Sequence, residues 1–134
     1  MIDAELREAI WQRADDRCEY CRLRQVHYAL WSHQIEHIVP RKHNGTDTLE
    51  NLAFACVRCN LGKSSNLTGI DSLTNEIVPL FHPRREEWHD HFRYEEANIQ
   101  GVTPTGRVTV YVLNMNEDNR LRLRYRLLEN HELD

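Results

Sequence analysis

Apolar residues spaced four apart predict an amphipathic helix near the start of the chain. Within residues 3–16, Leu6, Ile10 and Ala14 recur at that spacing and would share one helix face. Asp3 stands just before them and can cap the first turn, because its side-chain oxygen accepts from the unpaired N–H groups there. We expect this helix to pack against the core.

Short extended and polar segments alternate in the middle of the chain. Residues 32–39 are predicted to form a strand that ends at Pro40, because proline cannot continue a sheet interior. A polar loop follows over residues 41–47, then a short strand or turn over 52–55, and a helix over 59–64. The predicted order is strand, loop, strand, helix.

The remaining segments carry weaker patterns. Residues 68–79 alternate and contain turn residues, which predicts a hairpin, and residues 84–92 are predicted to be helical. Residues 94–101 could form a strand or a loop, and residues 22–31 could lead into a strand or form a short connection.

Two helices are expected at the C-terminal end. Thr103 can cap the first of them and Pro104 can occupy its first position, although the run of β-branched residues over 108–112 favours a strand. The second is predicted over residues 117–129. Its packed face would consist of Leu121, Tyr125 and Leu128, with Arg122, Arg124 and Arg126 largely outside that face.

Composition is that of an ordinary soluble domain. The chain has 134 residues, of which 40% are hydrophobic and 28% charged, so we expect one domain over residues 1–134. No apolar run approaches the ~20 residues of a membrane span, and we expect no membrane partner. The charged N-terminus has no signal-peptide core, so we expect a cytoplasmic protein.

The net charge of −4 argues mildly against a protein that coats nucleic acid. The excess of acidic residues lies after residue 85, where there are ten Asp and Glu and six Lys and Arg. Over residues 36–85 there are five Asp and Glu and six Lys and Arg. The middle of the chain is therefore nearly neutral and can still meet a phosphate backbone with well-placed cations.

Two C-x-x-C pairs supply all four cysteines and favour a metal over disulfides in a cytosolic chain. Cys18, Cys21, Cys56 and Cys59 would fill the four positions of a structural Zn²⁺ site. The 34 residues between the pairs exceed the ~15–20 of a compact zinc ribbon, so a functional insert must lie between them. The alternative is four unrelated buried or redox-active thiols.

The insert contains side chains suited to phosphodiester hydrolysis. Such a reaction needs a base to activate water and a cation to stabilise the developing charge. His37 can be the base, because an imidazole titrates near pH ~6.5. Glu36 is a hard oxygen donor, and Asn60 could complete a sparse Mg²⁺ site. On a regular strand Glu36 and His37 would point to opposite faces.

Other polar residues of the insert could support that chemistry. Asn51 can hydrogen-bond the backbone and fix the loop that carries His37. The predicted nucleic-acid contacts are Lys63, Arg58, Arg41 and Lys42. Each residue has a plainer alternative: a core histidine for His37, a helix N-cap for Asn60, and solvated surface charges for the cations.

Together these motifs resemble the HNH endonucleases. The resemblance rests on six ordered elements: Cys18-Glu-Tyr-Cys21, Glu36-His37-Ile38-Val39-Pro40, Asn44-Gly45, Glu50-Asn51-Leu52, Cys56-Val-Arg-Cys59, and Asn60 with Lys63. They cover residues 18–63, and the tail is also similar to small bacterial HNH proteins. The resemblance implies an α+β fold with a ββα-metal core (the HNH or His-Me finger) at about residues 18–66. An N-terminal helix and a C-terminal extension of hairpins and helices, about residues 67–134, would flank it.

The resemblance also implies a role for each matching residue. His37 matches the general base, Asn51 the residue that orients the base and its loop, and Asn60 a ligand of the catalytic ion. Glu36 stands where the family usually has Asp, as a second ligand of that ion, which would be Mg²⁺ or Mn²⁺. The cysteines match structural zinc ligands.

We therefore predict a metal-dependent endonuclease acting on DNA, with a homodimer or a protein partner if both strands are cut. A zinc-stabilised nucleic-acid-binding module without catalysis is the alternative, and a zinc scaffold for a protein partner is a third.

Overall fold

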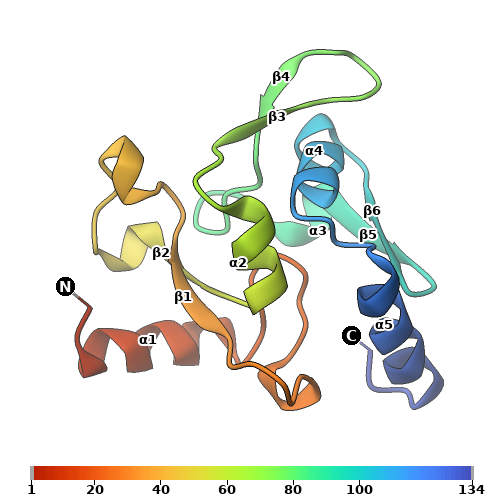
Figure 1. Ribbon diagram of the computed structural model, residues 1–134, viewed down its shortest axis with the longest axis horizontal. Coiled ribbons are helices and arrows are strands. Elements are labelled where there is room, and N and C mark those ends of the chain that lie inside the picture. The colour runs from red at the N-terminus through yellow and green to blue at the C-terminus, as the bar shows by residue number, and fades with distance from the viewer. Residues whose placement is uncertain (1, 134) are drawn as a thin grey trace.

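The structure is a computed structural model that describes residues 2–133. Figure 1 shows the arrangement of its elements. In chain order they are α1 (Ala4–Ala14), β1 (Gln34–His37), β2 (Leu52–Ala55), α2 (Val57–Lys63), β3 (Thr68–Ile70), β4 (Ile77–Pro79), α3 (Trp88–His91), β5 (Phe92–Glu95), β6 (Asn98–Gly101), α4 (Pro104–Val112) and α5 (Asp118–Glu129). The fold is α+β, as predicted, and 3-10 turns at Gln25–His27, Arg41–His43 and Leu49–Asn51 join these elements.

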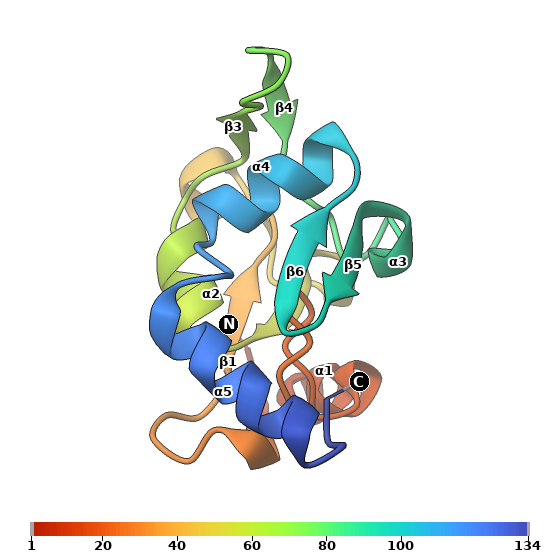
Figure 2. The same cartoon turned by 90° about the vertical axis from the view of Figure 1, so that its right-hand side faces the viewer.

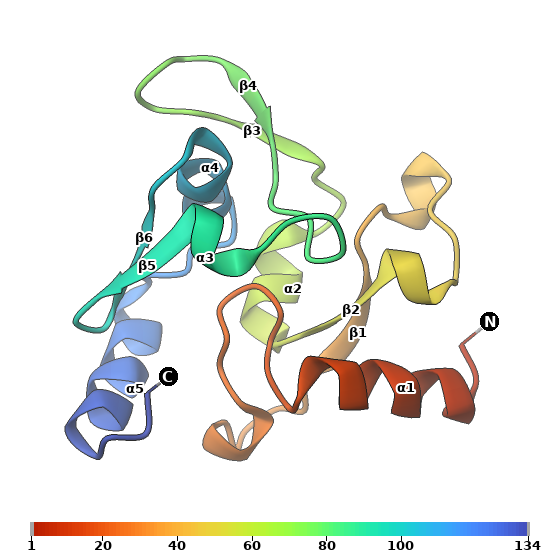
Figure 3. The same cartoon turned by 180° about the vertical axis from the view of Figure 1, so that it is seen from behind.

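The described strands pair into three antiparallel hairpins, β1–β2, β3–β4 and β5–β6. In the first, His37 pairs with Leu52 and Gln34 with Ala55. α1 lies on one side of this hairpin and α2 on the other, as Figure 3 shows. The predicted order of strand, loop, strand and helix is therefore present.

A small apolar cluster joins α1 to the first hairpin. Ile10 and Ala14 of α1 pack with Leu52 and Phe54 of β2, and Ile35 of β1 borders the cluster. Asp3 caps α1, since its side chain accepts a hydrogen bond from the backbone N–H of Leu6 at 2.8 Å. The predicted helix, its cap and its packed face are all confirmed.

The C-terminal extension builds a second layer over the core. Figure 2 shows α4 between the β3–β4 hairpin and the β5–β6 hairpin. Asp71, beyond the end of β3, is fully buried, and both of its carboxylate oxygens accept from Arg107 of α4 at 2.9 Å. The predicted hairpin over 68–79 and the helix opened by Thr103 are confirmed; Thr103 accepts from the N–H of Gly106.

Two sequence predictions about elements are corrected. The helix expected over residues 84–92 is confined to Trp88–His91, because His82 and Glu86 form a turn before it. The N–H of Glu86 donates to the His82 carbonyl, and the Glu86 side chain accepts from the N–H of His82. α2 begins at Val57 rather than near residue 59, because Cys56 caps it with its sulfur.

The packed face of α5 also differs from the prediction. Arg120, Arg124 and Leu127 are buried, whereas Tyr125 and Leu128 are exposed. The guanidinium groups can be buried because internal acceptors satisfy them: Arg124 donates to the carbonyls of Ala97 and Met115. Hydrophobic spacing alone therefore gave the wrong face.

Across residues 2–133, no helix is both long and apolar enough to span a bilayer.

Candidate functional site

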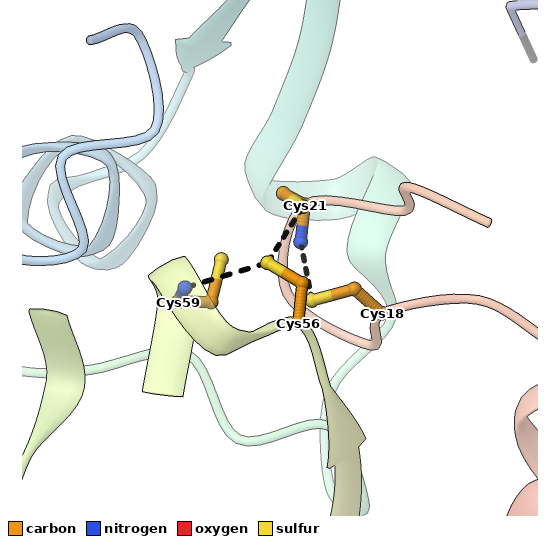
Figure 4. Close-up of side chains that lie close together, drawn as sticks. All are labelled: Cys18, Cys21, Cys56 and Cys59. Atoms are coloured by element: carbon orange, nitrogen blue, oxygen red, sulfur yellow. Dashed lines mark hydrogen bonds between the residues drawn. The ribbon is translucent and has the colours of Figure 1, made fainter. Parts of the chain in front are cut away.

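Four buried cysteines converge between the loop that follows α1 and the start of α2. Figure 4 shows their sulfur atoms pointing toward one another. All four Sγ atoms lie within 4.8 Å of one another, and those of Cys21 and Cys56 are 3.7 Å apart. A tetrahedral zinc with Zn–S bonds of about 2.3 Å requires sulfur atoms about 3.8 Å apart. The spacing fits a zinc ion and is too long for a disulfide.

Backbone hydrogen bonds organise each cysteine pair. The N–H of Cys21 donates to the Cys18 sulfur at 3.5 Å, and the N–H of Cys59 donates to the Cys56 sulfur at 3.4 Å. Burial raises the pKa of the Cys18 and Cys59 thiols, so a cation is needed to hold these two as thiolates. Four thiolate positions leave no open coordination site, which suits a structural zinc.

The first cysteine pair also secures the hairpin. Glu19, within that pair, donates its N–H to the carbonyl of Phe54 and accepts from the Phe54 N–H through its side chain, at 2.8 and 2.7 Å. These bonds lie on the edge of β2 that β1 does not occupy. The indole N–H of Trp88 donates to the Tyr20 carbonyl at 2.7 Å. The cysteine site thereby connects the hairpin to the C-terminal extension.

His37 occupies the last position of β1 and contacts a carboxylate from the following loop. Its Nε2 lies 2.7 Å from Oδ1 of Asp47, and the two side chains are 18% and 22% exposed. Arg41 donates to both oxygens of Asp47. Because a carboxylate only accepts, Nε2 carries the proton, and Nδ1 of the neutral imidazole keeps its lone pair. Among residues 2–133, that nitrogen has no hydrogen-bond partner.

Asn51 holds the loop that connects His37 to Asp47. Its amide nitrogen donates to the carbonyls of Val39 and Thr46 at 2.9 Å, and its oxygen accepts from the N–H of Val39 at 2.8 Å. Gly45 lets the two sides of this loop approach each other, since a Cβ at residue 45 would lie 1.6 Å from the Val39 carbonyl oxygen. The buried amide of Asn51 therefore joins the two ends of the loop, and the N–H of Gly45 adds a bond to the Pro40 carbonyl at 3.0 Å.

Glu36 points away from His37, to the face of β1 that meets α2. Its carboxylate is buried, lies 3.1 Å from Nζ of Lys63 and accepts from the hydroxyl of Tyr20. Burial raises the pKa of Glu36, and the Lys63 ammonium opposes that rise. Adjacent strand residues face opposite sides, which explains the divergence.

Asn60 lies inside α2, and its amide donates to the side-chain oxygen of Gln34 at 2.5 Å. The N-cap alternative is excluded, because Cys56 caps the helix. The structure gives Asn60 and Glu36 different partners. Each of these predicted metal ligands already has a partner, Lys63 for Glu36 and Gln34 for Asn60.

The four predicted nucleic-acid contacts differ in their surroundings. Lys63 is only 2% exposed, and Nζ donates to the carbonyls of His37 and Ile38, so its ammonium does not face solvent as the prediction required. Arg58 pairs with Glu117 at 3.1 Å. Arg41 pairs with Asp47 but is 64% exposed, and Lys42 is exposed beside it.

Sequence reasoning missed Asp47 and Arg120. Asp47 stands ten residues beyond His37 in the polar loop, and the Asn44-Gly45 turn between them was the signal that the chain doubles back there. Arg120 donates to the sulfur of Cys59 across 61 residues of sequence, and no spacing or motif indicated that contact.

Comparison with known proteins identifies the central segment. A family model described as HNH endonuclease matches residues 18–66. The match runs from the first cysteine pair through α2, so it contains His37, Asn51 and Asn60 and ends before β3. Searches of curated proteins and of solved structures each found no match. The match agrees with the predicted HNH resemblance over residues 18–66.

Proposed function

Because residues 18–66 belong to the HNH endonuclease family, we propose that this protein is an endonuclease that hydrolyses DNA phosphodiester bonds. The observation that carries the proposal is the His37–Asp47 contact within the matched segment. It fixes the imidazole in the tautomer whose free nitrogen can accept a proton. Asn51 holds the loop that makes this contact possible.

His37 would act as the general base. Nδ1 takes a proton from water as the water oxygen attacks phosphorus, and the bond from phosphorus to the leaving oxygen breaks. The Asp47 carboxylate stabilises the imidazolium that forms, through the proton on Nε2. Arg41 and Lys42 lie in the same loop as Asp47, where they can contact the phosphate backbone.

A divalent ion such as Mg²⁺ or Mn²⁺, which the family implies, would stabilise charge on the leaving oxygen. The proposed ligands do not fit that ion as they stand, because Lys63 already neutralises Glu36 and the Asn60 amide contacts Gln34. We therefore assign no step to the ion. The zinc held by the cysteines would take no part in the chemistry.

A plasmid assay tests the proposal. Supercoiled DNA is incubated with the zinc-loaded protein in Mg²⁺, in Mn²⁺ or in EDTA, and nicked and linear products are measured. We expect relaxation with a divalent ion and none in EDTA, and the zinc content of the EDTA sample shows whether the structural ion was retained. Folded, zinc-loaded protein that cleaves in no condition would contradict the proposal.

Glu36 already pairs with Lys63 and the Asn60 amide with Gln34, which supports one alternative, a zinc-stabilised nucleic-acid-binding module without catalysis. Such a module would retard the same plasmid without cleaving it in either ion. A titration of binding run beside the cleavage assay distinguishes the two functions.

Asp47→Asn should lower kcat for cleavage by roughly 10²-fold while KM changes little, because it impairs a base that contributes roughly 10²- to 10⁴-fold. The asparagine amide can donate to Nε2, which would favour the tautomer with a proton on Nδ1 and block the base. Single-turnover cleavage rates at several DNA concentrations separate the two constants. Asp47→Glu keeps an acceptor and is the matched comparison. Equal rates for parent and Asp47→Asn would remove Asp47 from the mechanism.

A further inference from the structure

A buried arginine from α5 reaches the cysteine site. Nη2 of Arg120 lies 2.8 Å from the sulfur of Cys59 and 3.8 Å from that of Cys56. The residue is 9% exposed. It lies outside the segment that matches the family, which ends at residue 66. The contact is therefore supplied by the C-terminal extension.

Charge explains why a guanidinium suits this place. Four thiolates and one Zn²⁺ carry a net charge of −2, and a buried charge is costly unless it is paired. Arg120 brings one permanent positive charge and a directed N–H donor to the buried sulfur atoms of Cys59 and Cys56. It halves the net charge without occupying a coordination position.

The same guanidinium is bound to the end of α4. Nη1 donates to the carbonyls of Leu113 and Asn114 at 2.8 and 3.1 Å. Arg120 thus joins three parts of the molecule: the cysteine site, the end of α4 and its own helix. If zinc strengthens the Arg120–Cys59 contact, then docking of α5 must strengthen zinc binding by the same free energy.

Packing beside this contact is incomplete. A cavity of about 70 Å³ lies between α5 and the cysteine loops, with Cys21, Leu23, Tyr94 and Leu127 among its lining residues. The cavity interrupts the apolar contact between α5 and the loop that carries Cys21. The polar contacts of Arg120 therefore carry a larger share of the docking of α5.

From these contacts we propose that Arg120 is a positioning residue of the metal site, which stabilises the zinc thiolates and couples zinc binding to the docking of α5. The alternative is a purely structural role, in which Arg120 only satisfies the carbonyls at the end of α4. The two differ in whether the metal responds when the guanidinium is changed. The proposal does not depend on nuclease activity.

The first test compares rates of zinc release to a chromogenic chelator. Arg120→Gln should release zinc about 10- to 100-fold faster than the parent, the usual effect of removing a hydrogen bond to a metal ligand. Arg120→Lys keeps the charge but not the planar fork, so its rate should be intermediate. Arg126→Gln, an exposed arginine of the same helix, is the matched control and should release zinc at the parent rate.

A second measurement reports directly on the sulfur atoms. With Co²⁺ in place of zinc, the thiolate-to-cobalt charge-transfer bands of Arg120→Gln should move to lower energy, because the thiolate loses a hydrogen-bond donor. A residue that only caps α4 would leave these bands unchanged. If Arg120→Gln does not fold, Arg120→Lys provides the same readings. Parent-like zinc release together with parent-like bands in a folded variant would overturn the proposal.

Discussion

His37→Ala is expected to lower the rate of DNA cleavage by roughly 10²- to 10⁴-fold, the usual contribution of a positioned general base. The imidazole is the group on the matched segment that has one nitrogen held by a carboxylate and the other able to accept a proton. Single-turnover cleavage of supercoiled plasmid measures the effect. Free imidazole added to the reaction should restore part of the rate.

His43→Ala is the matched control, because His43 is an exposed histidine of the same loop. It should cleave at the parent rate. The His37 variant should stay folded, since it loses one partly exposed hydrogen bond worth about 0.5–1.5 kcal/mol. Parent-like cleavage by folded His37→Ala would exclude this residue as the base, and the proposed mechanism with it.

Removal of zinc is expected to abolish the cooperative folding of the protein. Structural zinc sites contribute roughly 10–16 kcal/mol in small zinc domains, which equals or exceeds the roughly 5–15 kcal/mol of net stability typical of a domain. The four cysteines lie in the larger apolar cluster of the protein, together with Tyr20, Phe81 and Trp88. Without the ion, their thiolates would repel one another or take up protons. Cys59→Ser, or chelation of the parent, should therefore remove the thermal unfolding transition.

Circular dichroism during heating measures that loss, and native mass spectrometry confirms that the ion is gone. The same chelator saturated with zinc is the control and should leave the parent unchanged. A metal-free protein that unfolds at the parent Tm would show that the cysteine cluster does not depend on an ion.

The sequence correctly predicted those helices whose structure depends mainly on residues within or next to the helix. α1 follows from its spacing and its Asp3 cap, and α4 forms despite its β-branched run because Thr103 and Pro104 begin it. Tertiary contacts decide the rest. The buried face of α5 depends on acceptors that lie elsewhere in the chain, and these cannot be read from the spacing within the helix.

The candidate site divides in the same way. The cysteine cluster was predictable, because two C-x-x-C pairs carry their own geometry. The contact of His37 with Asp47 depends on the path of a loop that the Asn51 amide helps to close. The pairing of Glu36 with Lys63 depends on which face of β1 meets α2, and the strand pattern indicated only that the two neighbours diverge.

The place of Arg120 in the chain bears on how the protein is made. All four cysteines of the proposed zinc site have been synthesised by residue 59, whereas the arginine that contacts Cys59 follows 61 residues later. At about 5–20 residues per second, that interval lasts about 3 to 12 s. A nascent chain can thus capture its metal before α5 exists, and the last helix then docks onto a site that is already loaded.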